Sequence, residues 1–259
     1  MIIFIMILGA CLGSFCASLA SRIVEKKPLF TLHSFCFSCG KKIRFYELVP
    51  ILSYVFLRAK CSNCKCALPF SLLINEILGI ILLVLVYFLS FCLYDFLLLS
   101  LFLFNFFLLS LIDMQLKAVP QSLLWSAFLF ALFYSFKPGE IEYFLIFKEL
   151  KEGFFLNAFN FAGFIFLLKS FVFYLKHFQN KNEIFDNLGD ADIIIMAGIA
   201  GILGFEYGFL TLFLASLLTL PFFVFLKNKA LKTQELAMIP FLNIAFIVVL
   251  FYKNSGLFS

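Results

Sequence analysis

The sequence predicts an all-α fold: a polytopic membrane helix bundle of about eight transmembrane helices with a small cytoplasmic zinc-binding insert. Its composition, its long apolar runs and one polar block with paired cysteines are the observations behind this prediction. The chain has 259 residues, of which 64% are apolar, 14% are charged and 41 are Phe, and its mean hydropathy is +1.07. A soluble domain is about half apolar and about a quarter charged. The excess of apolar residues is therefore typical of a chain that is solvated by lipid.

The apolar runs have the length of membrane spans. A transmembrane helix needs about 20 mainly apolar residues, and about eight runs approach this length. They lie at roughly 2–21, 71–91, 93–112, 120–136, 154–175, 193–206, 207–226 and 237–252, with the fourth and the sixth shorter than most. Gly198, Gly201 and Gly204 recur within the sixth run, and we expect them to form one smooth face for close helix packing.

Basic residues predict the orientation of the chain. None precedes the first apolar run, whereas Arg22, Lys26 and Lys27 follow it. Because loops rich in Lys and Arg stay on the cytoplasmic side, the N-terminus is expected outside and residues 22–70 inside. The net charge of +5 then reflects membrane topology rather than a nucleic-acid footprint. The expected surroundings are a lipid bilayer, and no nucleic-acid partner is expected.

One sizeable polar block divides the chain into three predicted parts. These are a first transmembrane helix (1–21), the cytoplasmic insert (22–70) and a transmembrane core (71–259). A block as small as the insert has little apolar core of its own, so we expect it to depend on a bound metal ion for much of its folding free energy.

The insert carries the pairs Cys36-x-x-Cys39 and Cys61-x-x-Cys64, which are separated by 21 residues. This spacing is close to the template for a zinc site, in which two tight turns complete a tetrahedron of thiolates around the ion. The predicted cytoplasmic location disfavours disulfides. We therefore expect these four cysteines to bind a structural zinc ion. Four unliganded thiols or a redox pair are the alternatives, and Cys66 is a further thiol that could enter the site.

Acidic residues beside the apolar runs are the candidates for catalysis. Asp113 follows the run 93–112, and Asp190 and Asp192 precede the sixth run, all at the predicted inner face. Two carboxyl groups brought close together cannot both ionise cheaply, so one can act as acid while the other activates water. Positions two apart on a helix face different ways, so only one of the later pair can partner Asp113. The adjacent Gly189 allows a close backbone approach and favours Asp190.

The alternative for these aspartates is an ordinary interfacial charge that reaches water at the end of a span. Glu76 lies deeper, within the second apolar run, and we expect it to face the interior of the bundle.

Several short motifs follow one another over most of the chain. They are Gly13-Ser14-Phe15 with Ser21-Arg22, the stretch from Glu47 to Tyr54 around Pro50, Leu57-Arg58-Ala59-Lys60-Cys61, the two cysteine pairs, Glu76, Ile112-Asp113 with Val119-Pro120, Leu188-Gly189-Asp190 and Ile239-Pro240-Phe241. Together they resemble the motifs of the bacterial type IV prepilin peptidase family.

The resemblance implies a multi-pass aspartic endopeptidase of the bacterial inner membrane, with its active site facing the cytoplasm. Members of the family cut the basic leader from prepilins and pseudopilins just after a glycine, so such proteins are the expected partners. Many members then N-methylate the new N-terminal residue with S-adenosylmethionine, which is thus an expected cofactor beside zinc. Carried over, the catalytic pair would be Asp113 and Asp190, the zinc ligands Cys36, Cys39, Cys61 and Cys64, and the peptidase core residues 71–259.

Departures from the family pattern keep two other hypotheses open. Asn187 stands where the family has a glycine and Asp192 where a lysine is usual, as expected of a catalytically degenerate scaffold in a pilus or secretion system. Leu48 and Ala59 depart within the insert, the part linked to methyl transfer. The third hypothesis is a proton-coupled transporter that uses the carboxylates as a relay. The cysteine pairs and the clustering of aspartates at one face argue against it.

Overall fold

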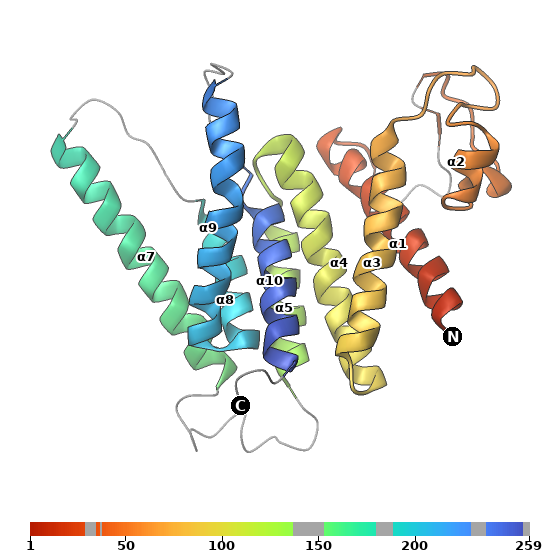
Figure 1. Ribbon diagram of the computed structural model, residues 1–259. Helices are drawn as coiled ribbons and strands as arrows, with labels where there is room; N and C mark the ends of the chain where they lie inside the picture. The colour runs from red at the N-terminus through yellow and green to blue at the C-terminus, as the bar shows by residue number, and fades with distance from the viewer. Residues whose placement is uncertain (29–34, 37, 137–152, 180–188, 229–236, 256–259) are drawn as a thin grey trace. The chain divides into compact units, whose positions relative to one another are not determined.

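A computed structural model of the chain describes residues 1–28, 35–36, 38–136, 153–179, 189–228 and 237–255 (Figure 1). Regular structure within these residues is helical, with two isolated β-bridges and no strand. The predicted all-α fold is thus confirmed. The chain forms two compact units, Met1–Gln115 and Leu116–Ser259.

Unit 1 holds a pair of long helices and the polar insert. Its elements are α1 (Ile2–Val24), the 3₁₀ helix η1 (Phe45–Leu48), α2 (Leu52–Phe56), α3 (Phe70–Leu89) and α4 (Leu93–Leu116). Helices α1 and α3 lie side by side, and the insert with η1 and α2 connects the end of α1 to the start of α3 (Figure 1). The insert is therefore tethered at both ends to one helix pair.

Three glycines let the backbones of α1 and α3 touch. A Cβ atom added at Gly79 of α3 would lie 2.4 Å from the carbonyl oxygen of Gly9 and 2.7 Å from the Cα of Gly13, both in α1. A Cβ at Gly13 would in turn lie 2.3 Å from the carbonyl oxygen of Asn75. Small residues at a membrane helix interface allow this close approach, so only glycine fits at these positions.

Replacing Gly79 by alanine is expected to force α1 and α3 apart, because backbone atoms cannot move aside as a side chain can. Overpacking of this kind costs about 1–3 kcal/mol. The measurement is the unfolding midpoint of the purified protein in detergent. Gly163→Ala is the matched control, since a Cβ there meets nothing within 4 Å in the described part of the chain. Equal midpoints for the two variants would contradict the close packing of α1 on α3.

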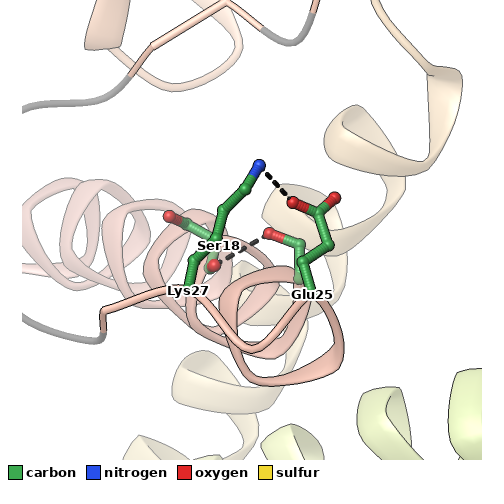
Figure 2. Close-up of polar contacts among 4 residues, drawn as sticks. Ser18, Glu25 and Lys27 are labelled. Carbon is green, nitrogen blue, oxygen red and sulfur yellow. Dashed lines mark hydrogen bonds and ion pairs between the residues drawn. The ribbon is translucent and has the colours of Figure 1, made fainter.

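Helix α1 ends in a short polar segment. The hydroxyl of Ser21 donates a hydrogen bond to the carbonyl oxygen of Ser18 at 2.9 Å. Just beyond the helix, Lys27 forms an ion pair with Glu25 (Figure 2). An exposed pair of this kind contributes little stability. The basic cluster after α1 is therefore better explained by the predicted membrane orientation than by folding energy.

Unit 2 is a bundle around one central helix. Its elements are α5 (Gln121–Ser135), α7 (Phe154–Gln179), α8 (Asp190–Leu203), α9 (Phe205–Asn228) and α10 (Ile239–Asn254). Helix α8 packs against each of the other four. It is buried over nearly all of its length from Ile195 to Leu203, whereas its first turn carries the two acidic residues.

Glycines and phenylalanines hold this bundle together. A Cβ atom added at Gly198 would lie 3.6 Å from the Cβ of Ala131 in α5, and one added at Gly201 would clash with the ring of Phe154 in α7, as expected for glycines at close helix contacts. The prediction that Gly204 belongs to the same packing face is wrong, because Gly204 has φ of +94° and ends α8. Glycine adopts such a conformation without steric cost, so the chain can turn directly into α9.

The eight predicted apolar runs are all helices. Five of them, α1, α3, α4, α7 and α9, are long and apolar enough to cross a membrane, whereas α5 and α10 are shorter apolar helices and α8 has 14 residues. Two of these helices extend beyond their predicted apolar runs: α4 continues to Leu116, and α8 begins at Asp190. The catalytic candidates therefore lie inside helices rather than beside them. The predicted orientation and the predicted three-part division remain predictions.

Candidate functional site

Two turns of the same design present the cysteines of the insert. In the first, the N–H of Cys36 donates to the carbonyl of Lys41 at 2.9 Å, and the N–H of Gly40 donates to the carbonyl of Cys36 at 3.0 Å. An isolated β-bridge between Phe35 and Lys42 closes this turn. Gly40 has φ of +65°, which glycine adopts readily. The Cys36-x-x-Cys39-Gly sequence thus folds into a tight loop with both thiols on one side.

The second turn repeats this pattern without glycine. The N–H of Cys61 donates to the carbonyl of Cys66 at 2.9 Å, and the N–H of Lys65 donates to the carbonyl of Cys61 at 3.1 Å. A β-bridge between Lys60 and Ala67 closes the turn. Lys65, with φ of +56°, takes the place of Gly40 and is strained for a residue with a side chain. The closure of the turn therefore has to offset that strain.

The two turns bring four thiols together. The sulfur atoms of Cys36, Cys39, Cys61 and Cys64 all lie within 4.8 Å of one another and could hold a metal ion. Zinc with four thiolates at about 2.3 Å in a tetrahedron places its sulfur atoms about 3.8 Å apart. The sulfur atoms of Cys36 and Cys64 are separated by 3.8 Å. The donor set and its spacing thus fit a zinc ion.

The backbone also prepares one ligand for a cation. The N–H groups of Cys64 and Asn63 donate to the sulfur of Cys61 and lower the pKa of that thiol to about 6. A thiolate rather than a thiol is the metal ligand. Asn63 further links the two turns, because its side-chain oxygen accepts a hydrogen bond from Lys41 at 3.1 Å.

A buried carboxylate docks the insert on the helix pair. Glu76 of α3 is buried, as expected from its place in the second apolar run. One of its oxygens accepts a hydrogen bond from the hydroxyl of Ser14 in α1 at 2.9 Å, and the other accepts one from the N–H of Ile51 at 2.7 Å. Ile51 stands at the start of α2 with φ of +61°, a conformation that β-branched residues rarely adopt. The Glu76 contact stabilises this strained turn.

The insert is also held internally, through Glu47 of η1. The hydroxyl of Ser62, from the second cysteine turn, and the N–H of Arg44 both donate to this carboxylate and keep its pKa below the usual value. Polar contacts therefore run from the second cysteine turn through η1 and the following turn to Glu76. The insert is thus joined to the helix pair by polar contacts as well as by the chain itself.

Replacing Glu76 by alanine is expected to loosen the insert without unfolding α1 and α3. The substitution leaves the N–H of Ile51 and the hydroxyl of Ser14 without an acceptor, at about 1–3 kcal/mol for a buried group. Limited trypsin digestion measures the effect as faster cutting within the insert. Ser14→Ala is the matched control, because it removes only the donor to one carboxylate oxygen. Unchanged protection in Glu76→Ala would contradict the docking role.

Asp113 is a buried carboxyl in the last turn of α4, with 8% of its surface exposed. The neighbouring Ile112 is fully buried. A carboxyl group at the C-terminal end of a helix is not favoured by the helix dipole, and burial in an apolar helix adds to its cost. Its presence there is therefore a sign of function rather than of stability.

Asp190 lies at the opposite kind of helix end. It is the first residue of α8 after the cap Gly189, where the helix dipole favours an acidic group. Its side chain is 89% exposed and pairs with the ammonium group of Lys169 in α7 at 2.8 Å. Asp192 is half-buried in the same turn. The exposed carboxylate of Asp190 is thus positioned by a neighbouring helix and accessible from outside the bundle.

The Lys169 contact was not predicted from the sequence. A signal for it existed, since Lys169 is a single charge within the long apolar run 154–175, and such residues usually pair with a functional group. Asp113 belongs to unit 1 and Asp190 to unit 2, so the meeting of their carboxyl groups remains a prediction. Asn187, the departure beside Asp190, lies outside the described residues.

Comparison with known proteins connects this arrangement to a family. A family model described as the Bacterial Peptidase A24 N-terminal domain matches residues 7–90, which include the helix pair and the insert. A prepilin leader peptidase/N-methyltransferase of Vibrio cholerae is 26% identical over 253 residues, covering 95% of this chain and 93% of that protein. The chain is similar to prepilin leader peptidase/N-methyltransferases over nearly its whole length. The resemblance predicted from its motifs is thereby confirmed.

Two further prepilin leader peptidase/N-methyltransferases match over shorter stretches. The protein of Myxococcus xanthus is 36% identical over 62 residues, which are 24% of this chain and 18% of that protein. The protein of Dichelobacter nodosus is 42% identical over 53 residues, which are 20% of this chain and 18% of that protein. No solved structure matches the chain at a comparable level of significance.

Proposed function

We propose that this protein is a multi-pass aspartic endopeptidase of the bacterial inner membrane that removes the leader of type IV prepilins or pseudopilins. The observation that carries the proposal is the similarity to a prepilin leader peptidase/N-methyltransferase over 95% of the chain. Cleavage after a glycine at the cytoplasmic face follows from the family resemblance and from the predicted orientation of the spans.

Asp113 and Asp190 are the proposed catalytic pair. One carboxylate takes a proton from water, which then attacks the carbonyl carbon of the glycine before the cut. The other carboxyl group gives a proton to the leaving amine, which becomes the new N-terminus of the pilin. The burial of Asp113 and the placement of Asp190 by Lys169 support this division of labour between two differently solvated groups.

The proposed role of zinc is structural. Cys36, Cys39, Cys61 and Cys64 would hold the ion, which contributes folding free energy to the insert when it is bound. The cleavage reaction needs no group from this site. N-methylation of the new N-terminal residue with S-adenosylmethionine is a second proposed activity, suggested by the names of the relatives.

Co-expression with a tagged prepilin that has a basic leader and a Gly-Phe junction tests the proposal. The intact mass of the pilin is expected to fall by the mass of the leader, and a further methyl group on the product would establish the second activity. A pilin that stays unprocessed beside abundant protein, and a second pseudopilin that also stays unprocessed, would support the degenerate scaffold instead. The departure at Asp192 is the observation that favours that scaffold.

A further inference from the structure

The second cysteine turn contains one more thiol than the first. The two turns have the same pattern of backbone hydrogen bonds, so Cys66 occupies the position in the second turn that Lys41 has in the first. Lys41 points its ammonium group at Asn63, at an exposed position. The side chain of Cys66 instead lies half-buried among the other thiols.

The sulfur of Cys66 lies as close to the sulfur of Cys36 as the sulfur of Cys64 does. The distance to the sulfur of Cys36 is 3.7 Å for the sulfur of Cys66 and 3.8 Å for the sulfur of Cys64. Both values match the sulfur–sulfur separation of about 3.8 Å in a tetrahedral zinc site. Cys36 is the buried cysteine of the cluster, and both Cys64 and Cys66 lie beside its sulfur.

As placed, Cys64 and Cys66 are too close together to be neighbouring ligands of one zinc ion. Their sulfur atoms are 3.2 Å apart, which is shorter than the edge of a zinc tetrahedron. Structural zinc sites are four-coordinate. Cys36, Cys39 and Cys61 supply three ligands, which leaves one position for two neighbouring donors.

We propose that Cys66 is an alternate fourth ligand, which exchanges with Cys64 at the metal centre while the other three cysteines stay bound. Exchange moves one thiolate off the ion and another onto it, so the charge of the site and its coordination number are unchanged. The inference rests on the proposed metal centre and is independent of peptidase activity. Exchange would let the second turn keep the metal ion when Cys64 is lost, whereas the first turn has no second thiol to replace Cys39.

Metal content after dialysis against a chelator tests this in the full-length protein purified in detergent from zinc-supplemented cells. Cys64→Ala and Cys66→Ala are each expected to keep about one zinc ion per chain, whereas Cys64→Ala/Cys66→Ala is expected to keep less than about a tenth of that. Cys39→Ala is the matched control, because Lys41 offers no spare thiol, and it should lose zinc as the double variant does. Loss of zinc from Cys64→Ala to the same extent as from Cys39→Ala would overturn the proposal.

Alkylation of the zinc-loaded wild-type protein decides the matter if a variant fails to fold. A short pulse of iodoacetamide followed by peptide mass analysis reports which thiol is free. Exchange predicts that the label divides between Cys64 and Cys66, with Cys36, Cys39 and Cys61 protected. Label confined to one of the two exchanging thiols would show a fixed set of ligands and overturn the proposal.

Discussion

Replacing Asp113 or Asp190 by asparagine is expected to reduce leader cleavage by about 10²- to 10⁴-fold, the usual contribution of a positioned acid or base. Asparagine keeps the shape of the side chain but neither takes nor gives a proton at the reacting bond. The measurement is the rate at which the purified variant shortens a prepilin, followed by intact mass. Normal cleavage by either variant would show that the residue concerned is not catalytic.

Asp192→Asn is the matched control for this experiment. Asp192 lies in the same turn of α8 as Asp190, and its side chain is half-buried rather than exposed. We expect this variant to cleave at close to the wild-type rate. If Asp192→Asn loses activity and Asp190→Asn keeps it, the partner of Asp113 has been assigned to the wrong aspartate.

Removing the metal is expected to unfold the insert while the long helices stay folded. Cys36→Ser removes the buried thiol of the cluster, and because Cys64 and Cys66 supply one ligand between them, three thiolates remain for the ion. A structural zinc ion contributes about 10–16 kcal/mol of apparent binding free energy to a small domain. Zinc content should fall from about one ion per chain to almost none, and trypsin should cut rapidly within the insert.

Cys92→Ser is the control for the loss of a thiol, because Cys92 is an exposed cysteine between α3 and α4, away from the cluster. It should retain both zinc and resistance to trypsin. A Cys36→Ser protein that binds zinc as the wild type does would contradict the metal centre. So would a wild-type protein that is purified without any metal.

The features that could be predicted from sequence are those encoded locally. Apolar runs of sufficient length indicated every long helix, and the spacing within Cys36-x-x-Cys39 and Cys61-x-x-Cys64 indicated a cluster of thiols, because a tight turn places both thiols of a pair on one side. The ends of α4 and α8 could not be predicted. Met114, Gln115 and Leu116 are good helix formers that carry α4 past Asp113, although the apolar run has already ended.

Contacts between distant residues were beyond the reach of sequence patterns. Glu76 was expected in the bundle interior, but nothing in its neighbourhood along the chain points to the N–H of Ile51, which lies in the polar insert. The pairing of Lys169 with Asp190 likewise depends on how α7 packs on α8. Both contacts place a charge from one helix against a turn of another segment, and only the packing of the elements decides which turn that is.

Cross-linking tests most directly whether Asp113 and Asp190 form one site. Asp113→Cys and Asp190→Cys would be combined in a protein without Cys11, Cys16 and Cys92, treated with a short thiol-reactive cross-linker, and mapped by peptide mass analysis. A link between positions 113 and 190 is expected.

Asp113→Cys with Glu206→Cys is the control pair. Glu206 is exposed just past the opposite end of α8, about 20 Å from its first turn for a helix of this length, and no link to it is expected. A link from position 113 to 206, with none to 190, would show that the two aspartates lie at different faces and would contradict the aspartic peptidase.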